Sequence, residues 1–461
     1  MSKPDLYLSE RGYVLKKNAI SESIVNKIRN DLTVTPKSND FVSIPPKSFQ
    51  IFTENKSKLY IPRFYGLKEF GEPEENFLIS LGDDVDLNFK GDLREHQKPI
   101  VENMMNVLNT KGGGILNLFT GQGKTVLAIK IMSILKKKTL IIVHKEFLLN
   151  QWLERLNEFM PGIRIGFIRQ KQIDVENFDV VIGMLQSISM KEYPPDTFKS
   201  FGFSIVDEAH HISSEVFSRA LPKISTKYMM GLSATLDRKD GLRFVFEWFL
   251  GEAVQSQVES QELGDIYVNI IKFTDPKYQQ KLTNMNGKMN LPKMINRLTE
   301  SPNRLNIVLN ILKECVSHDR KILLLSERRA NLQHIGELCK DNELEYGFYY
   351  GGMKQKDLKE SETKQILLGT YNMISEGFDL KALDTLVFVS PKSDVVQSSG
   401  RILRQGKNRP TIPLIIDIVD QTDYYKRVSS KRNLYYKKTG FTITKKTLTD
   451  TLIHITELKN N

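Results

Sequence analysis

Cysteine is scarce in this chain of 461 residues, which contains only Cys315 and Cys339. The two do not form the paired ligand spacing of structural zinc sites, and such low cysteine usage is typical of reducing, intracellular compartments. Long apolar runs are missing as well. No stretch approaches the roughly 18 residues of a membrane-spanning helix, and residues 1–5 do not resemble a signal peptide. We therefore expect a soluble, intracellular protein without a membrane partner.

Acidic residues are outnumbered, since 55 Asp and Glu stand against 66 Lys and Arg, which gives a formal net charge of +11. An excess of this size favours a nucleic-acid partner but carries no information about sequence specificity. The chain is longer than a domain with a single hydrophobic core usually is, which predicts about two to four domains. Strand-like and helix-like segments alternate along the chain, which is typical of α/β proteins.

The most informative stretch is an apolar, strand-like segment at residues 115–119, followed by a tight loop and a helix from about Lys124. Two glycines let several N–H groups of the loop point at a polyphosphate, and the helix N-terminus adds to the attraction. We expect Lys124 to reach the β- and γ-phosphates of ATP and Thr125 to bind Mg²⁺. Leu118 stands where the full pattern asks for glycine, and a glycine-rich turn without function is the alternative. The loop consists of Thr120, Gly121, Gln122, Gly123, Lys124 and Thr125.

Gln97 precedes this loop, at the start of a helix that runs to about Leu108. Its amide can pair with adenine, accepting a hydrogen bond from N6 and donating one to N7. A glutamine on a helix is usually a plain surface residue. Its place shortly before a phosphate loop nevertheless favours a contact between Gln97 and the adenine of ATP.

Two acidic residues, Asp207 and Glu208, follow the apolar strand at residues 203–206. A carboxylate at a strand tip beside a phosphate loop can hold Mg²⁺ through its water shell, and its neighbour can polarise the attacking water. We assign these roles to Asp207 and Glu208 respectively, with strand-end capping as the alternative. His210 is expected to couple the site to the rest of the protein, because no histidine or cysteine cluster supports a metal role for it.

The next strand, at residues 228–232, ends in the small polar triplet of residues 233–235. The hydroxyl groups of Ser233 and Thr235 would sense the state of the site. The triplet is a weak signal by itself and gains weight from the motifs before it.

In series, these motifs resemble motifs I, II and III of the superfamily 2 helicases, the second being the Asp-Glu-Ala-His box at residues 207–210. The resemblance covers about residues 92–425. The Gln-x-x-Gly-Arg-x-x-Arg pattern of motif VI, at residues 397–404, is highly specific when it occurs together with the other motifs. Further matches lie at residues 322–326, 350–352, 369–371 and 375–379.

This resemblance implies an α/β fold of two tandem RecA-like lobes with parallel sheets, which bind ATP between them. Arg401 and Arg404 would come from the second lobe and stabilise charge on the γ-phosphoryl group. The implied activity is a nucleic-acid-stimulated ATPase that works as a helicase or translocase. The family pattern also adds ATP-binding residues in the second lobe, namely Gly377, Asp379 and Gln397.

Within the superfamily, residues 231–242 are similar to the branch that contains XPB, phage UvsW and the poxvirus-type transcript-release DNA helicases. Residues 32–34 and 61–65 look most like the last of these and their relatives in large DNA viruses. A viral DNA helicase acting in transcription, or in repair and recombination, is implied. Its nucleic-acid partner would be DNA rather than RNA, and its protein partners would belong to those processes. It would act in the host cytoplasm, at replication sites or in the virion. Oligomerisation would not be required.

The expected domains are an N-terminal α+β domain at residues 1–90, a first lobe at 91–256, a connector at 257–300 and a second lobe at 301–461. Aromatic and basic residues suggest nucleic-acid contacts at both ends, with an ordinary core or a solvated helix as the alternatives. At the N-terminal end these residues are Tyr60, Arg63, Phe64, Tyr65 and Lys68. In the basic tail from Thr422 the aromatic ones are Tyr424, Tyr425, Tyr435, Tyr436 and Phe441.

Three rival functions share the same motifs. An RNA helicase has the same ATPase, although residues 143–152 lack the Pro-Thr-Arg-Glu-Leu pattern of DEAD-box proteins. A motor subunit could serve a nuclease carried by a partner. A binding module with a dead ATPase is disfavoured by the presence of Lys124, Glu208 and Arg404.

Overall fold

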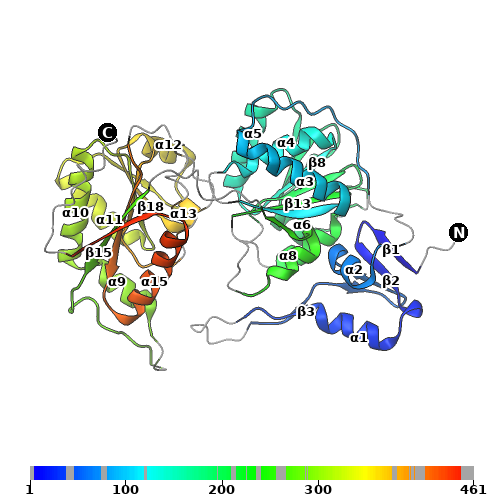
Figure 1. The fold of residues 1–461 in the computed structure, drawn as a ribbon, viewed down its shortest axis with the longest axis horizontal. Helices are drawn as coiled ribbons and strands as arrows, with labels where there is room; N and C mark the ends of the chain where they lie inside the picture. The colour runs from blue at the N-terminus through cyan, green and yellow to red at the C-terminus, as the bar shows by residue number, and fades with distance from the viewer. Residues whose placement is uncertain are drawn as a thin grey trace. The chain divides into compact units, whose positions relative to one another are not determined.

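The computed structural model divides into two units, Met1–Gln257 and Val258–Asn461, and each is described by itself (Figure 1). Within the described residues, no helix is both long and apolar enough to cross a membrane. The structure describes residues 5–37, 46–73, 80–118, 122–194, 196–208, 214–224, 226–234, 240–255, 266–285, 287, 289–375, 380, 382–393, 395, 399 and 411–447.

The N-terminal part of the first unit is a small antiparallel sheet with strand order β1-β2-β6-β5, accompanied by two helices and a short strand pair. Alternating residues of the strands fill one core; in β6, for example, Leu59 and Ile61 are buried while Lys58 and Tyr60 are not. Helix α1 is capped by Ser21, whose hydroxyl accepts a hydrogen bond from the N–H of Ile24, as the sequence predicts. The elements are β1 (Leu6–Ser9), β2 (Gly12–Lys16), α1 (Glu22–Asp31), β3 (Thr33–Val34), β4 (Phe49–Gln50), β5 (Thr53–Glu54), β6 (Lys58–Ile61) and α2 (Arg63–Phe70).

Arg63 at the start of α2 anchors this small sheet to the rest of the first unit. Its side chain is buried and donates hydrogen bonds to the carbonyl oxygens of Thr226, at 3.3 Å, and Lys227, at 3.0 Å. Burial lowers the pKa of the guanidinium to about 10. Tyr65 is buried too, with its ring 5.0 Å from that of Trp248 on α8 (Arg243–Leu250). For Arg63 and Tyr65, the structure therefore favours the core alternative over a nucleic-acid contact.

The larger sheet of the first unit has the order β10-β9-β11-β8-β12-β13-β7-β14, and all its pairings are parallel except that of β10. Its central strands are apolar and buried on both faces, as covered parallel strands are. Helices α3, α4 and α5 lie on one side of this sheet and α6 and α8 on the other (Figure 1). The strands are β7 (Gly113–Asn117), β8 (Thr139–Val143), β9 (Ile165–Arg169), β10 (Gln172–Ile173), β11 (Val180–Met184), β12 (Phe203–Val206), β13 (Tyr228–Ser233) and β14 (Ala253–Gln255). The helices are α3 (Lys98–Lys111), α4 (Lys124–Leu135), α5 (Glu146–Phe159), α6 (Leu185–Met190) and α7 (Ser214–Ala220), with α8 as above.

The second unit is built on a seven-stranded parallel sheet in the order β17-β18-β16-β19-β20-β15-β21. Alternate residues of β16 pack against helices on the two faces of this sheet. Ile322 and Leu324 belong to one hydrophobic cluster with α10 and α11, and Leu323 and Leu325 belong to another with α12, α13 and α15. Both cysteines are buried free thiols in this unit. The strands are β15 (Tyr267–Phe273), β16 (Ile322–Ser326), β17 (Tyr346–Tyr349), β18 (Ile366–Thr370), β19 (Thr385–Phe388), β20 (Leu414–Asp420) and β21 (Thr442–Thr447). The helices are α9 (Leu291–Thr299), α10 (Pro302–Ser317), α11 (Arg329–Asp341), α12 (Gln355–Thr363), α13 (Tyr371–Ser375) and α15 (Asp423–Lys438).

The stretch expected to be a connector, residues 257–300, differs from that expectation. Its strand β15 lies inside the second sheet, between β20 and β21, and its helix α9 packs against Tyr425 of α15. Much of it is therefore an integral part of the second unit. A local pattern cannot reveal this, because the partners of β15 lie more than a hundred residues further along the chain.

Removing the Arg63 anchor should loosen the N-terminal sheet. In Arg63→Met the apolar stem is retained, but two buried carbonyl groups lose their charged donor, which costs about 1–3 kcal/mol. In hydrogen–deuterium exchange, residues 58–70 should exchange faster, because the free energy of local opening falls by the same amount. Exchange in residues 301–375 should be unchanged. Lys68→Met, at an exposed position of the same helix, should leave both regions as in the wild type. Equal exchange in the two variants would show that Arg63 is not an anchor.

Candidate active site

The candidate site lies where three neighbouring parallel strands of the first unit end. Strand β13 runs between β12 and β7, and the register aligns Ser233 with Asn117 and Gly231 with Val206. The carboxyl ends of adjacent parallel strands meet at one edge of a sheet, which is where α/β proteins bind ligands. The described residues that directly follow β7, β12 and β13 are therefore neighbours in space.

The loop after β7 enters α4 through Gly123, which has a left-handed backbone with φ of +83°. A side chain there would also collide with Gln97, because an added Cβ would lie 2.6 Å from Nε2 of that residue. Conformation and space both require glycine at this position. Lys124 and Thr125 then form the first turn of α4, where unpaired backbone N–H groups favour anions.

Gln97 is buried against this loop. Its Nε2 donates to the carbonyl oxygen of Gln122 at 3.0 Å, and its Oε1 accepts from the N–H of Arg94 at 3.0 Å. Each end of the amide retains the capacity for one further hydrogen bond. The contact that the structure shows thus links α3 to the phosphate loop, and the adenine contact stays a prediction.

Lys124 and Glu208, which the sequence separates widely, are brought together. The ammonium Nζ lies 3.5 Å from Oε1 of Glu208, and the two side chains are only 10% and 14% exposed. Glu208 also has a positive φ of 48°, which is costly for a residue with a Cβ. Strained backbone of this kind is concentrated at functional sites, and here it directs a carboxylate toward the lysine of the loop.

Asp207 is held by hydrogen bonds to both of its carboxylate oxygens. The indole Nε1 of Trp152 donates to Oδ2 at 2.8 Å, and the backbone N–H of Glu208 donates to Oδ1 at 2.9 Å. Burial, with a smaller contribution from the charge of Glu208, raises the pKa of the Asp207 carboxyl to about 6, against the opposing effect of Lys124. A divalent cation would favour the charged carboxylate.

Trp152 was not identified from the sequence as a site residue. It lies on α5 among buried apolar positions, so its pattern is that of an ordinary core residue. Only the tertiary structure shows that its N–H points at Asp207. The fixed carboxylate and the hydroxyl of Thr125 are the oxygen donors that Mg²⁺ prefers, so these residues fit the expected metal.

Ser233 is buried at the end of β13, and its carbonyl oxygen accepts a hydrogen bond from the N–H of Leu118 at 3.1 Å. It therefore contacts the strand that leads into the phosphate loop. The remaining predicted site residues lie outside the described residues: Thr120, Gly121, His210, Thr235, Gly377, Asp379, Gln397, Arg401 and Arg404.

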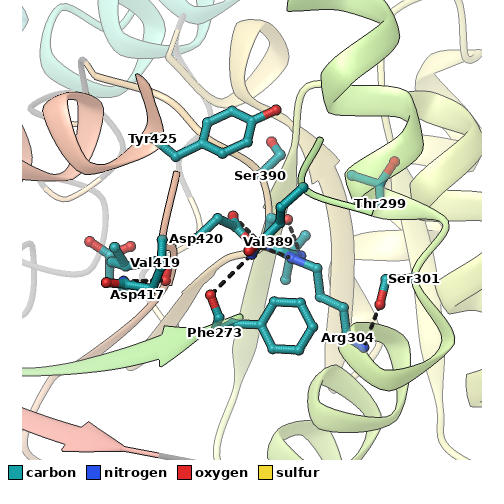
Figure 2. Close-up of polar contacts among 12 residues, drawn as sticks. Phe273, Thr299, Ser301, Arg304, Val389, Ser390, Asp417, Val419, Asp420 and Tyr425 are labelled. Atoms are coloured by element: carbon teal, nitrogen blue, oxygen red, sulfur yellow. Dashed lines mark hydrogen bonds and ion pairs between the residues drawn. The ribbon is translucent and has the colours of Figure 1, made fainter. Parts of the chain in front are cut away.

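In the second unit, buried arginines hold the backbone that leads from β19 toward the motif at residues 397–404. Arg304 of α10 donates to the carbonyl oxygen of Val389 at 2.6 Å and pairs with both carboxylate oxygens of Asp420 at 3.2 Å. Figure 2 shows the Arg304 side chain reaching Asp420 at the end of β20. Because Arg304 and Asp420 are both about 2% exposed, the pair is shielded from solvent.

A second buried arginine acts three residues further along the same segment. Arg432 of α15 donates to the carbonyl oxygen of Lys392 at 3.1 Å and lies 2.7 Å from Asp417, which also accepts from the hydroxyl of Tyr436 at 3.0 Å. The hydroxyl of Tyr371 donates to the carbonyl oxygen of Ser390 at 2.9 Å. The segment is therefore fixed at three carbonyl groups, those of Val389, Ser390 and Lys392, by α10, α13 and α15.

Comparison with known proteins agrees with this arrangement. Residues 90–238 match the family described as type III restriction enzyme, res subunit, and residues 303–406 match the helicase conserved C-terminal domain. A protein of Acanthamoeba polyphaga mimivirus named "Putative ATP-dependent RNA helicase" is 34% identical over 98% of this chain and 88% of its own length. The chain belongs to the superfamily 2 helicases. It is thus an ATP-dependent helicase, and hydrolase and nucleotide-binding functions follow from the family.

Two further similarities extend the comparison. A protein of African swine fever virus, also named "Putative ATP-dependent RNA helicase", is 28% identical over 77% of this chain and 74% of its own length. The solved structure of S. cerevisiae Dbp5 bound to RNA and ADP BeF3 has a TM-score of 0.52 at 14% identity, covering 76% of this helicase and 90% of Dbp5. The predicted α/β fold of two tandem RecA-like lobes, preceded by an N-terminal region, is confirmed.

Replacing Trp152 by phenylalanine should weaken the hold on Asp207 while filling most of the same volume. Partners of this kind typically change metal affinity by about 10- to 100-fold. We expect the Mg²⁺ concentration for half-maximal ATPase to rise about tenfold and Mn²⁺ binding in the presence of ATP, followed by electron paramagnetic resonance, to weaken in parallel. Trp248→Phe removes the other tryptophan of the chain and serves as the control. Unaltered Mn²⁺ affinity in Trp152→Phe would contradict the role.

Proposed function

We propose that this helicase uses the energy of ATP hydrolysis to move along or unwind DNA. The observation that carries the choice of DNA is the match of its first lobe to the type III restriction enzyme res subunit, together with the similarity of residues 231–242 to a branch of DNA helicases. RNA is the second candidate substrate, and the names of the mimivirus and African swine fever virus relatives favour it.

The proposed catalytic roles rest on the geometry of the first unit. Lys124 would exchange its contact with Glu208, now at 3.5 Å, for the phosphates of ATP. Glu208 would accept a proton from the attacking water. Thr125 and Asp207 would hold Mg²⁺, which neutralises charge on the phosphates when bound. Gln97 and the loop residues Thr120, Gly121, Gln122 and Gly123 would bind the nucleotide.

The second unit would complete the site. By the family pattern, Arg401 and Arg404 would stabilise charge developing on the γ-phosphoryl group, and Gly377, Asp379 and Gln397 would bind ATP. The buried Arg304 and Arg432 support this proposal, because they fix the segment that leads into that motif. His210, Ser233 and Thr235 would couple hydrolysis to nucleic-acid binding.

The viral relatives support a role in a large DNA virus. We propose that the helicase acts there in transcription, for example in transcript release, or in DNA repair and recombination. Proteins of those processes are the proposed partners.

Glu208→Gln should keep ATP binding and lose turnover, since the amide preserves shape but cannot accept the proton. General base catalysis contributes typically about 10²- to 10⁴-fold, so steady-state ATPase should fall by at least about 100-fold while a fluorescent ATP analogue still binds. Glu146→Gln, at an exposed site on α5, should behave as the wild type. Turnover of Glu208→Gln within twofold of wild type would overturn the assignment.

A parallel ATPase assay with single-stranded DNA, duplex DNA and single-stranded RNA of matched sequence tests the substrate. We expect DNA to stimulate hydrolysis at lower polymer concentration than RNA does. Stimulation by RNA alone would establish the second candidate instead. An absence of stimulation by every polymer would contradict a nucleic-acid motor altogether.

A further inference from the structure

Helix α15 presents two very different faces. The buried face carries Tyr425, Val428, Arg432 and Tyr436, which pack into the second unit. Arg432 and Tyr436 both bind Asp417 of β20, so this face is fixed rigidly to the sheet. The positive charge of Arg432 is paired with the buried carboxylate of Asp417 and does not contribute to the outer surface.

The outer face is basic. We call its five exposed cations the α15 basic face: Lys426, Arg427, Lys431, Lys437 and Lys438. The helix contains a single acidic residue, Asp423 in its first turn. Within the described ranges, none of the five cations has a carboxylate at ion-pair distance.

Several cations on exposed helical segments of the first unit are paired with acids one turn away. Such pairs join Lys98 to Glu95, Arg219 to Glu215 and Arg243 to Glu247. In α15, by contrast, Arg427 and Lys431 are like charges at positions i and i+4, which disfavours the helix.

The fold explains only part of the basic face. Lys437 and Lys438 lie at the C-terminus of α15, where the helix dipole favours cations. Lys426 and Arg427 lie beyond the first turn, where the helix dipole gives no reason for cations. Neither cation has an ion-pair partner in the described part of the chain, so both are available to a polyanion.

The spacing fits a phosphate backbone. At about 1.5 Å of rise and 100° of rotation per residue, the five cations occupy an arc of about 140° and extend over roughly 18 Å along the helix. One strand of duplex DNA passes about five phosphates in that length, at about 3.4 Å per phosphate along the axis.

Three of the five aromatic residues of the tail are buried, and the other two, Tyr424 and Tyr435, are partly buried. Tyr425, Tyr436 and Phe441 are at most 7% exposed, within the core of the second unit. The predicted stacking of these three rings on bases is therefore wrong, because the rings complete a hydrophobic core. Cations contact phosphates, and such contacts carry no sequence readout.

We propose that the α15 basic face is a contact for the nucleic-acid backbone that tethers the helicase without reading bases. The proposal deepens the proposed function, on which it rests. It assigns to the C-terminal helix a phosphate-binding role separate from ATP hydrolysis.

Neutralising three of these cations tests the proposal. In the triple variant Lys426→Gln, Arg427→Gln and Lys431→Gln, the log–log slope of affinity against salt should fall by roughly 2 for single strands, at about 0.7 per phosphate contact. The nucleic-acid concentration for half-maximal ATPase should rise about tenfold. ATPase without nucleic acid should be unchanged, since these side chains lie outside the catalytic groups.

The matched control removes three charges elsewhere on the same unit. Lys354, Lys356 and Lys359 are exposed at and near α12, where acidic residues are interspersed. Their replacement by glutamine should leave the salt slope as in the wild type. An equal loss of slope in the two variants would overturn the proposal, because it would show a general charge effect. Arg427→Lys, which keeps the charge, should retain the wild-type slope.

Two other outcomes also overturn the proposal. One is an unchanged salt slope in a triple variant whose circular dichroism is that of the wild type. The other is loss of binding to vesicles containing phosphatidylserine with unchanged binding to nucleic acid, which would make the face a membrane contact. Failure of the proposed function is distinguishable, because the wild type would then show no stimulation by any polymer.

Discussion

Parallel pairing of β12, β13 and β7 is the constraint on which the site depends. The three strands are separated in the sequence by most of a lobe, yet their carboxyl ends meet at one edge because each pairing is parallel and in register. This edge brings the ammonium of Lys124 to 3.5 Å from Glu208 and places Ser233 beside the strand that leads into the phosphate loop. A change in strand order would separate these groups even if every motif were kept.

Buried polar contacts then orient what the sheet brings together. The indole of Trp152 and the N–H of Glu208 hold both oxygens of Asp207, so the carboxylate has little freedom to rotate. Gln97 connects the loop to the start of α3 through its amide. A buried donor or acceptor is costly to leave unpaired, so each contact is specific as well as stabilising.

Buried arginines perform a comparable task over longer distances. Arg63 binds the carbonyl groups just before β13 and so attaches the N-terminal sheet to the strand that ends at Ser233. In the second unit, Arg304 and Arg432 bind carbonyl groups between β19 and the motif at residues 397–404, each with a buried aspartate as counter-ion. The planar guanidinium suits this role, because it can bond a carboxylate and a carbonyl group at once.

The sequence by itself determined the features that depend on neighbours along the chain. The apolar strands, the glycine before Lys124 and the acidic pair at residues 207–208 follow from local pattern and backbone chemistry, and the series of motifs was enough to predict the family and the fold. The tertiary structure decided everything that depends on partners distant in sequence. The N–H of Trp152 on Asp207, the place of β15 inside the second sheet, and the burial of Arg63 and Tyr436 are of this kind. Their physical reason is shared: an apolar or amphipathic pattern specifies that a residue is buried, but not which group it meets there.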